Sequence, residues 1–397
     1  MRRLKWLLVL VLLGGGTGLA LAPQWRSFDK MGERRFEVLS RPSSELLVGV
    51  VWPSAANGDG MVDGVRLASE EINAAHLAGG RRMRLAVRDP GVAWDAAKRI
   101  AIEFAETPEM CAVLGYYDDS QAIKASSLYE ASRLLHLIVG ANATPMTARG
   151  FSYLVRTVVA NDKIARALAR MSVGRGRRRV AVIWEEGAYG EDLAYQYGVA
   201  LDALDVNVVY RWSYLRERAD FRRPVNDLKS TDADTIFFAG FEPWAGDFIR
   251  MARQVGIRTE IVGGFSDTPE MRARTGAARE GAMFYEEYDL HSPTPENQAF
   301  VRKFRARYQR DPDTWAAQGY DSLYILARAV DATNSTNPLD LSYAIRFMDA
   351  WEGANGRYKF NDRGELDDKP IYLNAYRADK AVVVETSLPE PPAKIIR

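Results

Sequence analysis

Short apolar runs alternate along the chain with segments in which apolar residues recur at helical spacing. The run LLVGVVWP predicts a buried strand, and Val62, Val65 and Ile72 lie on one side of the helix predicted after it. The alternation continues through RMRLAVRD, AWDAAKRIAIEFAE, CAVLGYY, SQAIKASSLYEAS and LLHLIVGA. Repeated strand-helix units of this length predict a parallel sheet with helices on both faces.

A second series of the same kind begins after LVRTVVAND. Its predicted elements are DKIARALARMSV, RRVAVIWEE, a helix over 190–204, VNVVYRWSY, RRPVNDLKS, DTIFFAGF, WAGDFIRMARQVG and EIVGGFS. Two series predict two sheets and hence two lobes, and in such sheets ligands bind at the carboxyl ends of the strands. After the strand GAMFYEEY come two helices and then period-two alternation over 356–385, which predicts one closing hairpin.

The composition fits a protein of two globular lobes. Hydrophobic residues make up 47% and charged residues 26% of 397, enough for two cores. Acidic and basic residues nearly cancel, 52 against 53, so no field attracts a nucleic acid. The basic run RGRRR at 175–179 is interpreted as a solvated loop, with contact to anionic lipid or a partner as the alternative.

The first residues have the pattern of an export signal. Three basic residues, Arg2, Arg3 and Lys5, precede an uncharged run over 6–22. Cleavage is possible after Ala22, where the following Pro23 is unfavourable, or after Ala20. An uncleaved run of this length would instead anchor the chain in a bilayer. We therefore expect a periplasmic protein, either soluble or tethered to the inner membrane.

No pattern of an enzyme or a metal site is visible. His76, His136 and His291 lack metal-ligand spacing, and His136 lies in an apolar strand where a core role is expected. The nucleophile elbow, the phosphate loop and the dinucleotide fingerprint are missing between strands and helices. The single Cys111 is interpreted as a buried apolar residue. These observations favour a binding protein without catalytic residues, metal or cofactor over an enzyme.

Four segments in order, TARGFSYLVRTVVAND, VAVIWEEGAYGEDLA, DTIFFAGFEPWAGDFIRMARQVG and TWAAQGYDSLYILARAV, resemble the periplasmic leucine/isoleucine/valine-binding protein family. These are the type I solute receptors of ABC importers, and the resemblance runs from Leu46 to Tyr376. It implies an α/β Venus-flytrap fold, in which two Rossmann-like lobes with parallel sheets are joined by three hinge crossovers. The crossovers are expected near Arg156–Ala160, Glu280–Glu286 and Trp351–Tyr358.

The resemblance also implies a division of the chain and a set of partners. The expected parts are a signal peptide or anchor over 1–22, a linker over 23–45, lobe 1 over 46–157 and 284–352, lobe 2 over 158–283 and 353–385, and a tail over 386–397. The expected partners are a small-molecule ligand, such as an amino acid, amide or aromatic solute, and an ABC permease in the inner membrane. We expect a monomer. The alternative function is a membrane-tethered sensor of the same fold.

The family's amino-acid site is only partly matched. Asp119, with Ser120 next to it, stands where a serine of the family binds the ligand's carboxylate, and Asn142 stands where a threonine does. Gly140 falls where a backbone carbonyl receives the ligand's ammonium. Tyr189 matches the tyrosine that covers the ligand.

The match continues on the second lobe with one clear departure. Phe241 matches an aromatic residue that closes the cleft. Phe265 replaces the acidic residue that pairs with the ligand's ammonium, and Ser266 and Asp267 follow it. Asn57, in a shortened first loop, is expected to face the cleft.

The departures predict a ligand other than a free α-amino acid. A carboxylate at Asp119 uses the amide groups and dipole of its helix as a cap and repels a second carboxylate by a few kcal/mol in a partly dry cleft. A neutral or cationic ligand is favoured, unless Asp119 only caps and Ser120 takes the serine's role. The aromatic residues Tyr116, Tyr117, Tyr189, Phe241 and Phe265 either line the cleft for a flat body or pack between the lobes. The enzyme alternative would use Asp119 and Asp267 as an acid/base pair.

Overall fold

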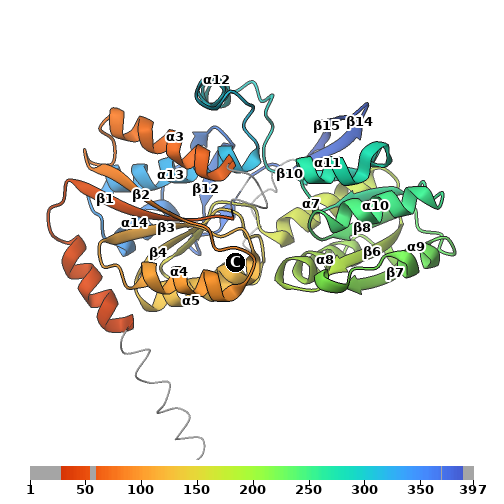
Figure 1. Ribbon diagram of the computed structural model, residues 1–397, viewed down its shortest axis with the longest axis horizontal. Coiled ribbons are helices and arrows are strands. Elements are labelled where there is room, and N and C mark those ends of the chain that lie inside the picture. Colours follow the sequence, from red (N-terminus) through yellow and green to blue (C-terminus); the bar gives the residue numbers. More distant parts are fainter. Residues whose placement is uncertain (1–27, 54–59, 368, 388–397) are drawn as a thin grey trace, which may run out of the picture.

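The computed structural model describes residues 28–53, 60–367 and 369–387, which form two lobes side by side (Figure 1). The prediction of an α/β fold with parallel sheets in two lobes is confirmed. Asn57 and the export segment over 1–22 lie outside the described residues. Within the described ranges, no helix has the length and apolar character to cross a membrane.

Lobe 1 is a five-stranded parallel sheet in the order β2-β1-β3-β4-β5. Helices α4 and α5 cover one face, and α3, α13 and α14 the other, while α12 packs outside α3 (Figure 1). Its strands are β1 (Glu45–Val51), β2 (Arg82–Arg88), β3 (Met110–Gly115), β4 (Leu135–Ile138) and β5 (Leu154–Arg156). Its helices are α3 (Gly60–Ala74), α4 (Trp94–Ala105), α5 (Asp119–Ala131), α6 (Pro145–Ala148), α12 (Pro295–Tyr308), α13 (Thr314–Thr333) and α14 (Pro338–Arg346).

Lobe 2 is a seven-stranded sheet in the order β15-β14-β10-β9-β8-β6-β7, in which β14 and β15 run antiparallel to their neighbours. Its strands are β6 (Arg179–Glu185), β7 (Asn207–Tyr214), β8 (Thr235–Ala239), β9 (Glu260–Gly263), β10 (Met283–Glu286), β14 (Tyr372–Arg377) and β15 (Lys380–Thr386). Its helices are α7 (Asn161–Gly174), α8 (Ala188–Asp202), η1 (Arg216–Arg218), α9 (Arg222–Leu228), α10 (Trp244–Gln254), α11 (Pro269–Thr275) and η2 (Gly276–Arg279).

The C-terminal alternation forms two structures rather than the single hairpin that its period predicts. Strand β12 (Gly356–Phe360) pairs with β11 (Trp351–Gly353) and β13 (Leu366–Asp367) in a small antiparallel sheet that packs against the helices of lobe 1. Only β14 and β15 form the hairpin that closes lobe 2. The third passage between the lobes therefore follows β13, later than the expected 351–358, and the second follows β10.

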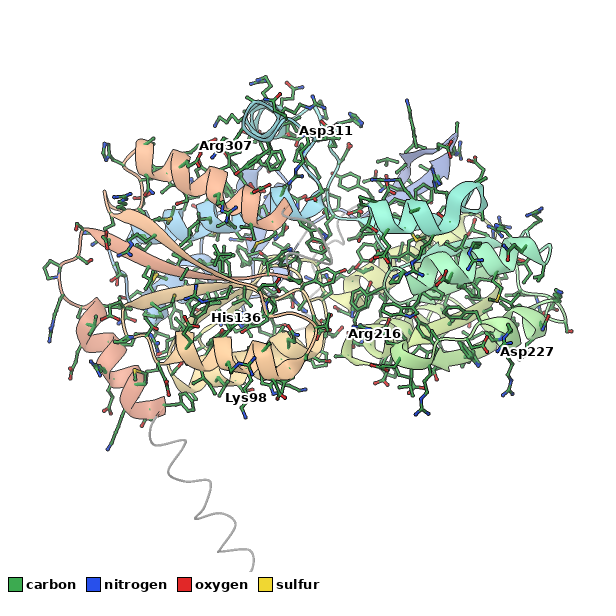
Figure 2. The ribbon with its side chains drawn as sticks, viewed as in Figure 1. Lys98, His136, Arg216, Asp227, Arg307 and Asp311 are labelled. Carbon is green, nitrogen blue, oxygen red and sulfur yellow. The ribbon has the colours of Figure 1, made fainter. Side chains whose placement is uncertain are left out.

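Close packing of α3 on α13 explains two glycines in these helices. A Cβ atom at Gly64 would lie 2.0 Å from the carbonyl oxygen of Ala316, and one at Gly319 would lie 2.5 Å from that of Met61. Only glycine allows the two backbones to approach this closely. On the opposite face of the sheet, His136 is buried and its Nε2 lies 2.9 Å from the carbonyl oxygen of Gly115 (Figure 2), the core role expected for it.

A helix over 28–39 occupies part of the segment expected to be a linker. It packs at the end of lobe 1 that is far from lobe 2 (Figure 1). The side chain of Arg35 is fully buried and donates hydrogen bonds to the carbonyl oxygens of Phe104, Ala105, Thr107, Met110 and Ser132. These groups come from the ends of α4 and α5 and the start of β3, so one side chain joins the helix to three elements of lobe 1.

Candidate functional site

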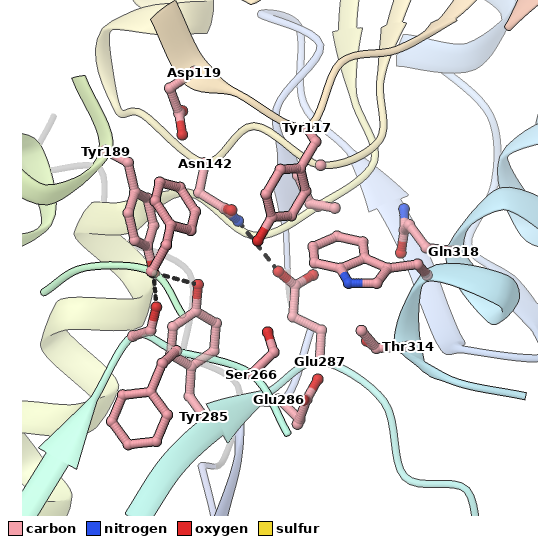
Figure 3. A pocket seen from close by; sticks show the side chains of 16 residues that line it. Tyr117, Asp119, Asn142, Tyr189, Ser266, Tyr285, Glu286, Glu287, Thr314 and Gln318 are labelled. Carbon is pink, nitrogen blue, oxygen red and sulfur yellow. Dashed lines mark hydrogen bonds between the residues drawn. The ribbon is translucent and has the colours of Figure 1, made fainter. Parts of the chain in front are cut away.

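An inner cavity lies between the lobes, where the carboxyl ends of strands from both sheets face each other (Figure 3). Its volume of about 30 Å³ leaves room for about two water molecules. The lobes are thus closed around a small space. The residues that line it are Tyr117, Asp119, Gly140, Asn142, Val158, Tyr189, Phe241, Gly264, Phe265, Ser266, Tyr285, Glu286, Glu287, Thr314, Trp315 and Gln318.

Asp119 contributes a buried carboxylate from lobe 1. The helix α5 is capped by Asp118, which accepts a hydrogen bond from the Gln121 amide at 2.9 Å, so the expectation of Asp119 as the cap is wrong. The Asp119 side chain, 2% exposed, turns instead to the loop after β4 and accepts from the Ala143 amide at 2.5 Å. Burial raises the pKa of Asp119 to about 7, and the nearby carboxylates of Asp118 and Asp192 add to that rise.

Glu286 and Glu287 contribute two further carboxyl groups at the end of β10 (Figure 3). Glu287 accepts from the Val159 amide at 2.9 Å and from the Asn142 amide at 3.3 Å. Burial raises the pKa of Glu287 to about 7 and that of Glu286 well above its usual value. Three buried carboxyl groups with raised pKa values therefore line the cavity.

Positive charge is absent from the cavity wall. Of the described residues that line it, none is Lys, Arg or His. Two cations lie behind the wall and are engaged with protein groups. Arg156 is paired with Glu365, and the ammonium of Lys369 lies 3.2 Å from the Tyr358 hydroxyl, with its pKa lowered to about 8 by burial. The cavity thus offers carboxyl groups, and no described cationic lining residue, to a ligand.

Aromatic rings close the cavity from both lobes. Tyr117 of lobe 1 and Phe241 of lobe 2 meet with ring centroids 5.5 Å apart, and Phe241 stacks on Tyr189 at 4.6 Å. Trp315 packs edge-on against Tyr117 at 5.4 Å. The Tyr189 hydroxyl donates to the carbonyl oxygen of Gly264 at 2.5 Å, which fixes this ring within lobe 2.

The structure brings together most of the residues named from sequence. Asp119, Gly140, Asn142, Tyr189, Phe241 and Phe265 all line the inner cavity. Ser120 lines a different cavity, nearer the mouth of the cleft. Asp267 is not among the lining residues, because its carboxylate binds Arg272 at 2.8 Å and the Tyr376 hydroxyl at 2.8 Å.

Two of the expected aromatic residues serve partly or wholly as core. Tyr116 is buried within lobe 1, where its hydroxyl lies 2.9 Å from that of Tyr129. Phe265 is 2% exposed and packs on Phe284, so little of its ring reaches the cavity.

Sequence reasoning missed the contributions of β10 and α13. The missed lining residues include Tyr285, Glu286, Glu287, Thr314, Trp315 and Gln318. A signal was present in YEEY, because two carboxylates directly follow a buried strand and so lie at the edge where ligands bind. The sequence pattern predicts only a strand and a crossover for that segment.

The described residues give no metal site, and the two aspartates of the acid/base alternative lie apart. Among the described residues, no group of three or more His, Cys, Asp or Glu side chains could hold a metal ion. Asp119 and Asp267 are not lining residues of a common cavity, which leaves the acid/base alternative without its pair.

A family model described as periplasmic binding protein matches residues 49–379. The chain belongs to this family. The binding protein is 26% identical over 341 residues to an amino acid binding protein of Pseudomonas aeruginosa, covering 81% of this chain and 88% of that one. It is also 26% identical to the leucine-specific-binding protein of Salmonella typhimurium, with 84% and 90% covered. These homologues are solute-binding proteins, and the binding protein shares that role.

Solved structures give the same assignment for the fold. A substrate-binding protein of an ABC transporter from Desulfitobacterium hafniense, in complex with Leu, has a TM-score of 0.77 and 27% identity, with 86% of this chain and all of that chain covered. A solute-binding protein from R. palustris in complex with benzoate has a TM-score of 0.78 and 21% identity, with 87% and 97% covered. The resemblance stated from sequence is confirmed.

Proposed function

We propose that the binding protein captures a cationic or amide-bearing solute that lacks a free carboxylate, and presents it to an ABC permease of the inner membrane without changing it chemically. The observation that carries this proposal is the inner cavity, which Asp119, Glu286 and Glu287 line and where no described lining residue is a cation. Without a ligand, bound protons keep these buried carboxyl groups neutral. The N–H groups of a ligand's ammonium or amide would take the place of those protons by donating hydrogen bonds to the carboxylates.

A ligand carboxylate has little to bind in this cavity. The Ala143 amide already donates to Asp119, and the next amide, of Thr144, donates to Asp192 at 2.7 Å. The Asn142 side chain donates to the Val159 carbonyl at 2.6 Å and to Glu287. The protein's own acceptors thus use the donors around Asn142, and a second carboxylate would meet uncompensated repulsion.

The relatives supply the general role but differ in ligand chemistry. The similar protein of D. hafniense was solved with Leu and that of R. palustris with benzoate, and both ligands carry a carboxylate. Asp119 and the absence of a described cationic lining residue favour a ligand with an ammonium or amide group in place of that carboxylate. Ligand binding would stabilise the closed lobes, since only that form brings both walls to the solute.

A thermal-shift screen with matched pairs tests the proposal. We expect leucinamide and benzylamine to raise the melting temperature, because a ligand at a hundred times its dissociation constant stabilises a protein by about 2.7 kcal/mol. Leucine, isoleucine, valine and benzoate should give no shift, since each presents a carboxylate to Asp119 and Glu287. Leucinamide is compared with leucine, and benzylamine with benzoate. The two members of each pair have the same apolar body and differ in whether they carry a carboxylate. A shift with leucine but not leucinamide would overturn the proposal.

A second candidate function is a membrane-tethered receptor, and the helix over 28–39 favours it. Arg35 joins this helix to lobe 1 by five hydrogen bonds, and only five residues separate the helix from the apolar run over 6–22. A retained run would hold lobe 1 within about 20 Å of the bilayer, because five residues span at most that distance. Lobe 2 would remain free to close.

N-terminal sequencing of the protein from membranes tests the tether. We expect the mature chain to begin before Trp6 and to enter solution only with detergent. As a control, a variant with a cleavable export signal joined to residue 24 should be released and should bind the same ligands. Recovery of the natural chain in the soluble periplasm, beginning at Leu21 or Pro23, would contradict the tether.

A further inference from the structure

The rings of Tyr117 and Phe241 divide the space between the lobes into an inner cavity and an outer part. Beyond these rings, toward solvent, lies a cavity of about 180 Å³, which we call the outer chamber. Tyr117 and Phe241 line both the inner cavity and the outer chamber, so these two rings are the partition between them. Movement of either ring would join the two spaces into one channel.

The lobe 2 wall of the outer chamber contains a flat stack of side chains, bordered by Glu242, Thr268 and Glu270. The guanidinium of Arg216 lies over the ring of Phe241 at 5.4 Å and over that of Trp244 at 5.2 Å. Arg216 forms an ion pair with the buried carboxylate of Glu185 at 2.5 Å, which neutralises its charge. Figure 2 shows Arg216 on the side of lobe 2 that faces lobe 1. The stack of Phe241, Arg216 and Trp244 is therefore a π surface without an unpaired charge.

Lobe 1 supplies the opposite wall, in which Asp118 and Gln121 lie beside apolar residues. Pro53 and Val92 line the outer chamber, and Val92 is 83% exposed in this structure. A third cavity of about 310 Å³ shares Asp118, Gln121 and Arg216 with the outer chamber but is also lined by Lys124, Glu185 and Glu186, and its wall is more polar. Of these two spaces, the outer chamber is the one that suits an apolar body.

We propose that the ligand has two parts: a primary ammonium in the inner cavity and a flat aromatic body in the outer chamber, joined by a short chain that passes between Tyr117 and Phe241. This inference rests on the proposed function and extends it to the class of arylalkylamines. The volumes support the division, because about 30 Å³ accommodates only a head group, whereas a dry cavity of about 150 Å³ holds benzene in another protein. Trp244 then determines specificity for the body.

Isothermal titration with n-propylamine and 3-phenylpropylamine tests this inference. Both carry the same ammonium and chain, and only the second has a ring. We expect 3-phenylpropylamine to bind the natural protein at least tenfold more tightly. Trp244→Ala should reduce that ratio below threefold and leave the affinity for n-propylamine unchanged, while Trp244→Phe, which keeps a flat ring, should restore most of the ratio. Trp94→Ala is the matched control, since Trp94 lines the third cavity and not the outer chamber.

The outcomes separate the two proposals. If neither amine binds the natural protein, the proposed function fails. If both amines bind with equal affinity, or Trp244→Ala weakens both equally, the outer chamber has no role and the proposed function stands. If Trp94→Ala lowers the ratio and Trp244→Ala does not, the aromatic body occupies the third cavity and the assignment to the outer chamber is overturned.

Discussion

We expect the affinity for a primary ammonium ligand to rise at least tenfold between pH 5 and pH 7. Burial raises the pKa values of Asp119 and Glu287 to about 7, so both carboxyl groups hold protons at pH 5 when no ligand is bound. An ammonium ligand binds the ionised carboxylates and must displace those protons. The affinity then increases by up to about tenfold for each proton released and each pH unit below 7. The ligand itself remains charged throughout, since an alkyl ammonium has a pKa of about 10.

Without ligand, closure of the lobes should become less favourable as the pH rises, which is the opposite of the trend in ligand affinity. A carboxyl group whose pKa is raised by closure stabilises the closed form when it is protonated, and loses this contribution as the pH rises through about 7. The groups near Asp119 are Asp118, Asp192 and Arg156, and those near Glu287 are Lys369 and Arg156. Lobe closure without ligand is thus favoured in acid, which small-angle scattering at pH 5 and pH 8 measures.

Two variants and one control decide whether these carboxyl groups are responsible. Asp119→Asn and Glu287→Gln should each lower the ammonium affinity at pH 7 by about tenfold or more, and should each reduce the slope of log affinity against pH by up to one. Glu186→Gln removes an exposed carboxylate at the cleft mouth and should change neither quantity. An ammonium affinity that falls with pH, or an equal slope in all four proteins, would show that the inner carboxylates do not bind the ligand.

The fold was predictable from sequence because its signals are local. Each strand of the two series is a short apolar run, each helix has one apolar side, and alternation of the two fixes parallel sheets. The motif AYGEDLA placed Tyr189 correctly at the start of α8 and in the cavity. The failures came where pairing is not local. Strand β12 alternates like a hairpin strand, yet its partners are β11 and β13.

The site was predictable in part for a related reason. Residues at the ends of strands in the two series could be placed at the cleft, and six of them line the inner cavity. The sequence does not tell in which direction a side chain points. Asp118 and Asp119 are adjacent and chemically alike, yet Asp118 caps its helix and Asp119 is a buried hydrogen-bond acceptor. The helix over 28–39 was missed because its sequence is largely polar and its fully buried side chain is that of an arginine, Arg35.

We expect Arg35→Ala to lower the free energy of unfolding of lobe 1 by about 3–5 kcal/mol. The five carbonyl oxygens that Arg35 binds lie at helix ends and at the start of β3, and they lose a charged donor in the variant. A buried acceptor left without a donor costs about 1–3 kcal/mol, and water entering the gap recovers part of that. Burial lowers the pKa of Arg35 only to about 10, so the guanidinium is charged at neutral pH. Its positive charge interacts favourably with the negative, C-terminal ends of the α4 and α5 dipoles.

Urea unfolding and hydrogen exchange measure this effect, with Arg34→Ala as the matched control because Arg34 is the exposed neighbour on the same helix. Arg35→Lys should give an intermediate loss, since one ammonium cannot reach five carbonyl groups from different elements. Exchange should accelerate at the ends of α4 and α5 as well as within 28–39, because Arg35 holds all three together. Ligand affinity should remain unchanged, since this end of lobe 1 is far from the cleft (Figure 1). Equal stability of Arg35→Ala and Arg34→Ala, or loss of protection confined to 28–39, would mean that the helix is an appendage and not a part of lobe 1.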